Sequence, residues 1–191
     1  MASSVKRPAT YEDLLKVPSH RVAEIVDGDL HVSPRPASRH ALASSSLGAG
    51  LGPPFHQGRG GPGGSWILDE PELHLGTDVL VPDLAGWRRE RMPEFPDVPA
   101  FTLSPDWVCE VVSPSTESLD RSKKMAAYGR ERVAHLWLVN PLARTLEVYR
   151  LADDRWLLLA THVGAARVRA EPFDAVELEL AALWIDPPAG S

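Results

Sequence analysis

Cysteine is almost absent from this sequence. Its 191 residues include one cysteine, Cys109, so an internal disulfide and a metal site built from several cysteines are both excluded. A chain that needs no disulfide suits a reducing compartment. We therefore expect a cytoplasmic protein.

Long hydrophobic runs are also missing. No stretch approaches the roughly 18 apolar residues of a membrane span. The first fifteen residues, MASSVKRPATYEDLL, contain no apolar segment of signal-peptide length. The sequence thus predicts a protein that is neither secreted nor embedded in a membrane.

Positive charge is in deficit, with 20 Lys and Arg against 26 Asp and Glu and a formal net charge of −6. The field of the whole molecule would not attract nucleic acid, so a nucleic-acid partner would need a local basic patch. Scattered, solvated charge is the competing interpretation of the available cations. The candidates for such a patch are Arg88, Arg89, Arg91, Arg121, Lys123, Arg130 and Arg132.

The remaining composition is that of a globular protein, with 43% hydrophobic and 24% charged residues. The length suits a single domain over 1–191, with a core over about 10–185. Eighteen prolines exceed the usual share of about 5%. We expect them in turns and at strand entries.

The N-terminal third begins with clear local signals. A helix is expected over 10–17, because Thr10 and Asp13 have capping-box spacing. Alternating residues on both sides of Asp27-Gly28 predict a hairpin with a type I′ turn. A helix over 38–51 and a glycine-rich loop over 52–65 follow.

The rest of the chain favours a sheet. Strands are expected over 66–75, 78–87, 106–112, 134–139, 145–151 and 156–161, with a helix over 117–132. The strand over 106–112 is the most apolar of these. This order of elements predicts an α/β (α+β) fold, in which a mixed central sheet is flanked by helices.

Three carboxylates interrupt apolar strand patterns. Asp83 lies on one expected strand face with Val81 and Ala85, Glu110 interrupts the buried strand, and Glu24 interrupts the first hairpin strand. An ionised carboxylate among apolar neighbours is costly unless it is paired, hydrogen-bonded or bound to a metal. If they converge, the three form an oxygen-rich pocket suited to Mg²⁺ or Mn²⁺.

Lys124 offers the complementary charge on the helix that follows the Glu110 strand. It precedes Tyr128 by four residues, which places both on one helical face. Such a lysine can orient an attacking water or stabilise charge on a phosphate oxygen. Carboxylates for a cation, a positioned water and a cationic side chain are what metal-assisted phosphodiester hydrolysis requires.

These residues occur in an order that resembles the Uma-two family of predicted restriction endonucleases, which is assigned to the PD-(D/E)XK nuclease superfamily. The resemblance covers roughly 10–184, and its most specific part is the EVVSPST stretch with the Asp-x-x-x-Lys-x-x-x-Tyr spacing after it. It is carried by EIVDG at 24–28, His40, Pro82-Asp83, EVVSPST at 110–116, Asp120, Lys124, Tyr128 and LWLV at 136–139.

The resemblance implies a restriction-endonuclease-like fold, a Mg²⁺ (or Mn²⁺) cofactor and DNA as the partner. It implies that Asp83 and Glu110 bind the metal, that Glu24 supports them, and that Lys124 is the catalytic lysine. The superfamily signature places a lysine two positions after the second acid, where this chain has Val112. Lys124 would have to replace it. The residues expected as substrate contacts are His40, Lys123, Arg121 and Tyr128.

Two other functions compete with a metal-dependent endonuclease. One is a catalytically silent module that binds nucleic acid or protein on a nuclease scaffold, and the other is a metal-dependent hydrolase of a different phosphate ester. Lys123 competes with Lys124 for the catalytic position, although Lys124 matches the spacing from Asp120. A homodimer is an option, because cutting both strands needs two sites or two visits.

Overall fold

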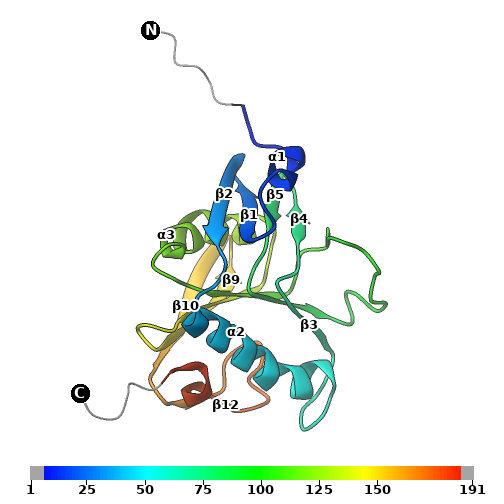
Figure 1. The fold of residues 1–191 in the computed structure, drawn as a ribbon. Helices are drawn as coiled ribbons and strands as arrows, with labels where there is room; N and C mark the ends of the chain where they lie inside the picture. The colour runs from blue at the N-terminus through cyan, green and yellow to red at the C-terminus, as the bar shows by residue number, and fades with distance from the viewer. Residues whose placement is uncertain (1–6, 186–191) are drawn as a thin grey trace, which may run out of the picture.

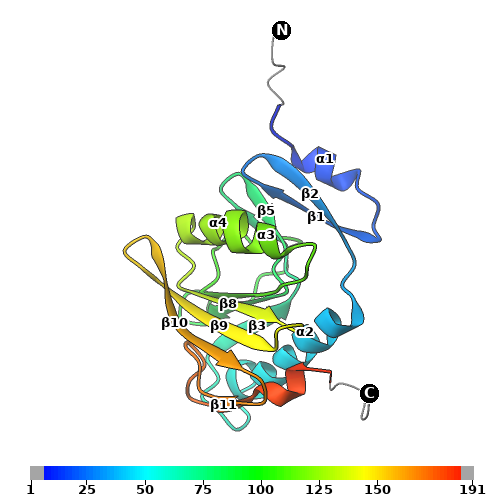
Figure 2. The ribbon, with the colours of Figure 1, turned by 90° about the vertical axis from the view of Figure 1, so that its left-hand side faces the viewer.

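Two β-sheets lie on either side of a helical segment in the computed structural model, which describes residues 7–185 (Figures 1 and 2). The six-stranded sheet contains, in spatial order, β10 (Arg155–Val163), β9 (Thr145–Ala152), β8 (His135–Asn140), β7 (Trp107–Val111), β6 (Leu84–Arg88) and β3 (Ser65–Asp69). The four-stranded sheet contains β2 (Asp29–Pro34), β1 (Arg21–Val26), β5 (Asp78–Leu80) and β4 (Leu73–Leu75).

The helical segments between the sheets follow one another without a break. They are α3 (Glu117–Leu119), the π-helical turn η2 (Asp120–Lys124) and α4 (Met125–Arg130). Elsewhere lie α1 (Tyr11–Leu15), α2 (Ser38–Leu51), the π-helical turn η1 (Gly52–His56), a small ribbon of β11 (Arg167–Val168) and β12 (Leu178–Glu179), and the 3₁₀ turn η3 (Leu180–Leu183). No helix within 7–185 is long and apolar enough to cross a membrane.

The central sheet is mixed, as the sequence predicts. Strands β7 and β8 run parallel, and every other neighbouring pair in this sheet is antiparallel. A parallel pair needs a crossover connection. The segment 112–134, which contains α3, η2 and α4, supplies it. The predicted mixed α+β class is therefore confirmed.

Strand β7 directs its side chains alternately into two cores. Trp107 and Cys109 face the core that α2 and the C-terminal segment cover. Val108 faces the second core, beneath α4 and the four-stranded sheet. By the two-residue period of a strand, Glu110 points to the same side as Val108, as expected from the sequence. A carboxylate is thus placed between the sheets.

Both long strands expected over 66–87 are broken, each at a proline. The first divides into β3 and β4 around Pro71, and the second into β5 and β6 around Pro82. Because proline has no N–H to donate to a sheet, each segment leaves one sheet at its proline and joins the other. Asp83 therefore lies in the break, and the prediction that it shares a strand face with Val81 and Ala85 is wrong.

The glycine-rich segment is not a loop throughout. Residues 52–56 continue α2 as the turn η1, with proline at its start, where a missing N–H is tolerated. The following residues fold back on it, since the N–H of Gly63 donates to the carbonyl of Pro54 at 2.8 Å. The loop predicted over 52–65 is therefore confined to 57–64.

The hairpin that carries Glu24 depends on a left-handed turn. Asp27 and Gly28 have φ of 51° and 76°, and Val26 pairs with Asp29, which is the predicted type I′ geometry. In this region a Cβ atom is strained. At Gly28 it would also lie 3.3 Å from the Cβ of Pro8.

We therefore expect Gly28→Ala to lower the free energy of unfolding by about 1–2 kcal/mol in urea denaturation. The control is Gly50→Ala, an exposed position inside α2 whose added Cβ meets only the Leu178 side chain, at an ordinary contact distance of 3.7 Å. That variant should be unchanged or slightly stabilised. Equal stability of Gly28→Ala and the wild type would contradict the strained turn.

Candidate active site

A cavity of about 300 Å³ opens where the two sheets and η2 approach one another. Its walls come from β1, from the break after β5, from the end of β7 and from the start of α2. Six ionisable side chains from these elements and η2 line it: Glu24, His40, Asp83, Glu110, Asp120 and Lys124. Residues up to 100 positions apart in the chain thus share one solvent-accessible space.

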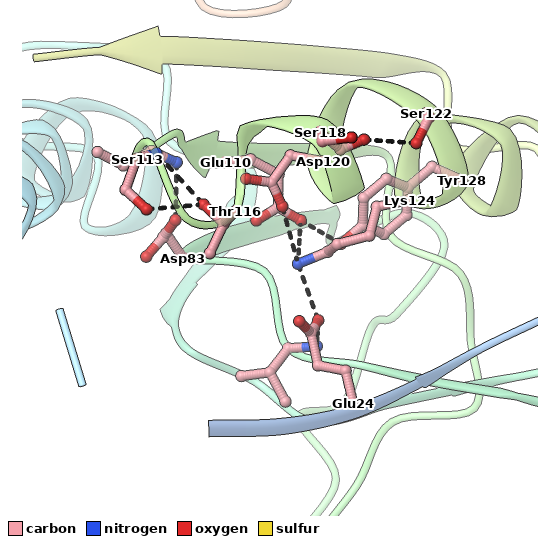
Figure 3. A network of polar contacts seen from close by, with 12 residues as sticks. Glu24, Asp83, Glu110, Ser113, Thr116, Ser118, Asp120, Ser122, Lys124 and Tyr128 are labelled. Atoms are coloured by element: carbon pink, nitrogen blue, oxygen red, sulfur yellow. Dashed lines mark hydrogen bonds and ion pairs between the residues drawn. The ribbon is translucent and has the colours of Figure 1, made fainter. Parts of the chain in front are cut away.

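The Lys124 ammonium group lies at the centre of this cluster (Figure 3). Its Nζ lies 2.8 Å from Oε1 of Glu24 and 2.8 Å from Oε1 of Glu110. The residue is 2% exposed. Burial alone would lower the pKa of Lys124, but the charges of Glu110 and Glu24 outweigh it and raise that pKa well above its usual value. Lys124 is thus a buried, permanently charged ammonium.

Glu110 receives a second donor from the helix. The Tyr128 hydroxyl donates to Oε1 of Glu110 at 2.5 Å, and the tyrosine is fully buried. Burial raises the pKa of Glu110 well above its usual value, with Lys124 opposing the shift and Asp120, Asp83 and Glu24 adding to it. Around Glu110 there is more negative charge than Lys124 alone balances.

Asp83 is held by the backbone beside Glu110. Its Oδ2 accepts a 2.7 Å hydrogen bond from the N–H of Val111, and its Oδ1 lies 3.2 Å from Nε2 of His40 on α2. Burial opposes protonation of His40, but the hydrogen bond and charge of Asp83 prevail and raise the pKa of the imidazole. In Figure 3 Asp83 lies to one side of the carboxylates that contact Lys124.

Asp120 belongs to the cluster, although the sequence motif indicated it only through its spacing from Lys124. It is 4% exposed, and its Oδ1 lies 3.8 Å from Nζ of Lys124. Burial raises its pKa, while Lys124 and a hydrogen bond from Thr116 oppose the shift. Its position four residues before Lys124 was the available signal, because that spacing places both on one helical face. The turn η2 that joins them is π-helical, a feature frequent at functional sites.

Glu24 connects the cluster to the four-stranded sheet. Besides Lys124, its Oε1 accepts a 2.8 Å hydrogen bond from the N–H of Val81, which directly follows β5. Glu24 is 6% exposed. It therefore holds Lys124 from the side opposite Glu110.

The composition of the cluster suits a hard divalent cation. Four carboxylates surround one lysine and one histidine, and carboxylate oxygens are the ligands that Mg²⁺ prefers. Within 7–185 no group of three His, Cys, Asp or Glu side chains is arranged to hold a metal. Asp83 and Glu110 would leave further positions to water and substrate, as is usual for Mg²⁺.

Three of the four expected substrate contacts lie outside the cavity lining. Arg121 forms a bidentate pair with Glu147 on β9, at 2.7 and 2.8 Å. Lys123 pairs with Asp29 at 2.9 Å, and Tyr128 is occupied by Glu110. Of the four, His40 lines the cavity. The structure thus favours Lys124 over Lys123 as the lysine of the site.

The proposed basic patch is largely neutralised by local pairs. Arg88 and Arg91 both contact Asp106, at 2.9 and 3.1 Å. Arg89 stacks 3.8 Å above the Trp66 ring. Arg130 contacts Asp27 and Asp78, and Arg132 contacts Asp154. Most of these cations therefore have an acidic partner in the structure, and none of them lines the cavity.

A helix end supplies positive potential at the cavity. Ala37, the N-cap of the 14-residue α2, lines the cavity, and α2 has no side-chain cap and no acidic residue in its first turn. The positive end of the helix dipole therefore faces this space, which favours an anion there. Arg35, which is exposed, lies on the rim just before α2.

Comparisons with known proteins point to one family. The family model Uma2, described as "Putative restriction endonuclease", matches residues 8–182. A solved structure described as a "putative nuclease belonging to DUF820 from Anabaena variabilis ATCC 29413" has a TM-score of 0.70 and 22% sequence identity, covering 92% of this chain and 97% of that one. No curated protein matches the chain. The shared architecture confirms the predicted restriction-endonuclease-like fold.

We expect Lys124→Met to lower the free energy of unfolding by about 3–5 kcal/mol at pH 7.5, because it leaves buried carboxylates without their cation. The folded-state pKa of Glu110 is raised above its unfolded value, so the ionised carboxylate destabilises the folded state at pH values above that pKa. Protonation of Glu110 removes this destabilisation as the pH falls. The destabilisation should therefore shrink toward pH 5. Urea denaturation at several pH values measures it.

The matched control is Lys123→Met, since Lys123 is the adjacent lysine and forms a half-exposed pair with Asp29. Such a pair contributes about 0–1 kcal/mol, so little change is expected at any pH. If both variants lost the same stability, or if the loss in Lys124→Met did not depend on pH, the buried ion cluster would not have the role assigned to it.

Proposed function

The chain belongs to the Uma2 family, and we propose that it is a metal-dependent endonuclease that hydrolyses DNA phosphodiester bonds. The family and the structural neighbour support a nuclease-like role. The observation that carries the finer proposal is convergence: Asp83, Glu110 and Lys124 line one cavity. Carboxylates beside a cationic side chain are the parts that metal-assisted phosphoryl chemistry needs.

In this proposal Asp83 and Glu110 hold a Mg²⁺ or Mn²⁺ ion. The bound ion would polarise the phosphoryl oxygen and lower the pKa of an attacking water. The backbone N–H of Val111 and the His40 imidazole fix the Asp83 carboxylate, and Tyr128 fixes Glu110. These contacts orient oxygen donors that would otherwise rotate, and such support is a large part of a metal site's affinity.

Lys124 acts on the substrate in this proposal. Its Nζ forms ion pairs with Glu24 and Glu110 at 2.8 Å each and lies 3.8 Å from Oδ1 of Asp120. In this proposal one N–H of the ammonium group turns toward the cavity, where it stabilises the attacking water or a phosphate oxygen. Glu24 is then a positioning residue, because it holds the Lys124 ammonium from the four-stranded sheet. Charge that develops on the phosphate meets a cation whose position is already fixed.

Substrate binding must be local in a protein of net charge −6. The N-terminus of α2 and the rim residue Arg35 supply positive potential beside the cavity. Affinity should therefore fall steeply with salt, as it does when phosphate contacts dominate. Cytoplasmic localisation and a homodimer remain predictions from the sequence.

We expect the wild type to nick plasmid DNA with Mg²⁺ or Mn²⁺, and Asp83→Ala and Glu110→Ala to lower the rate by at least about 100-fold. Gel electrophoresis across a metal titration measures the nicking. Glu94→Ala is the control, since Glu94 is an exposed carboxylate outside the cavity lining. It should cleave like the wild type.

Two outcomes would contradict the proposal. DNA binding without cleavage at any metal concentration would favour the catalytically silent module. Hydrolysis of another phosphate ester, with DNA left intact, would favour the alternative hydrolase. Thermal melting of each variant separates loss of the site from loss of the fold.

A further inference from the structure

A second cavity of about 320 Å³ adjoins the candidate active site. The two cavities share four lining residues: Val22, Arg35, Glu70 and Val81. The second cavity continues past these residues to α1 and the turn that follows it. The two cavities are therefore neighbours with the Arg35–Glu70 pair at their boundary, and together they are called the groove below.

The boundary is held by weak contacts. One Arg35 guanidinium nitrogen lies 3.6 Å from Oε2 of Glu70, and another donates to the carbonyl of Ser19 at 3.1 Å. The Arg35 and Glu70 side chains are 56% and 44% exposed. An exposed ion pair of this length contributes little stability, so a phosphate can replace Glu70 as the partner of Arg35 at little cost.

The second cavity has walls that suit a nucleoside. Leu14, Leu15 and Val17 line one side as apolar contacts. Arg21, also in the lining, is exposed and has no ion pair or side-chain hydrogen bond to residues 7–185. A free guanidinium beside an apolar wall can bind a phosphate while the wall covers a sugar or base.

The two cavities differ in the cations they offer to a ligand. In the first, Lys124 is buried and already contacts carboxylates. Arg35 and Arg21 are the arginines among the residues that line the groove, and both are exposed. Contacts to the phosphates next to the scissile one, on the side of the second cavity, would therefore come from these arginines.

We propose that the second cavity is a subsite for an unpaired nucleotide next to the scissile phosphate, with Arg35 contacting the phosphate at the boundary and Arg21 the next one along the strand. This inference rests on the proposed function and extends it to a single-stranded DNA segment that lies along the groove. Each cavity has the dimensions of a small-molecule pocket, which suits one strand better than a base pair.

The test measures the binding of a fluorescein-labelled 12-nucleotide single strand to the full chain. Fluorescence anisotropy gives the affinity in EDTA at several salt concentrations. We expect Arg35→Ala to weaken binding by about tenfold and to reduce the salt slope by about one. Glu70→Gln removes the competing carboxylate and should tighten binding. Arg59→Ala removes an exposed arginine outside both cavities and should change nothing.

A second pair of variants probes the apolar wall. Leu15 and Leu142 are 65% and 62% exposed, so neither Leu15→Asp nor Leu142→Asp should unfold the protein. Leu15→Asp places a negative charge in the second cavity and should weaken binding by about fivefold. Leu142 lies outside both cavities, so Leu142→Asp should bind like the wild type.

Unchanged affinity and salt slope in Arg35→Ala, with metal-dependent nicking intact, would overturn the subsite and leave the hydrolase proposal standing. A blunt 12-base-pair duplex is the second probe. If it binds more tightly than the single strand and loses as much affinity in Arg35→Ala, the claim that the subsite takes an unpaired nucleotide is overturned. Loss of nicking in Asp83→Ala together with unchanged oligonucleotide binding in Arg35→Ala would likewise reject the subsite alone.

Discussion

The contact of Lys124 with two carboxylates joins the parts of this molecule on which the site depends. Glu24 belongs to the four-stranded sheet, Glu110 to the six-stranded sheet, and the lysine to the helical segment between them. Each of these charges would be costly to bury alone. Together they require all three layers to be in place, so the geometry of the cavity and the packing of the sheets are established by the same interaction.

The broken strands determine where the remaining acid lies. Each of two chain segments leaves one sheet for the other at a proline, and the N–H of Glu70 donates to the carbonyl of Asp83 across the paired breaks. A residue within a regular strand would be committed to one core face. Asp83 instead lies between the regular strands, and its carboxylate reaches the end of β7 beside Glu110.

Charges on the surface are arranged in local pairs, whereas negative charge is concentrated in the cavity. Most cations that the sequence offered for DNA binding are paired with acids nearby, as Arg121 is with Glu147. Such pairs leave little field for a long-range attraction. The cavity instead concentrates carboxylates around one ammonium and opens toward a helix N-terminus. An acidic protein can therefore bind an anionic strand at one place, where the helix N-terminus and the exposed Arg35 supply positive potential and a bound divalent cation would add to it.

Local patterns in the sequence determined the hairpin at Asp27-Gly28 and the alternation that turns Glu110 toward the second core. They also placed Lys124 and Tyr128 on one helical face. Each of these features follows from neighbours a few residues away in the chain. Tertiary structure alone decided which sheet each half of the broken strands joins, which cations pair with an acid, and how deeply Asp120 is buried beside Lys124. The physical reason is that burial and ion pairing depend on residues distant in the chain: Lys123 and Lys124 are adjacent, yet one meets Asp29 at the surface and the other meets Glu24 in the interior.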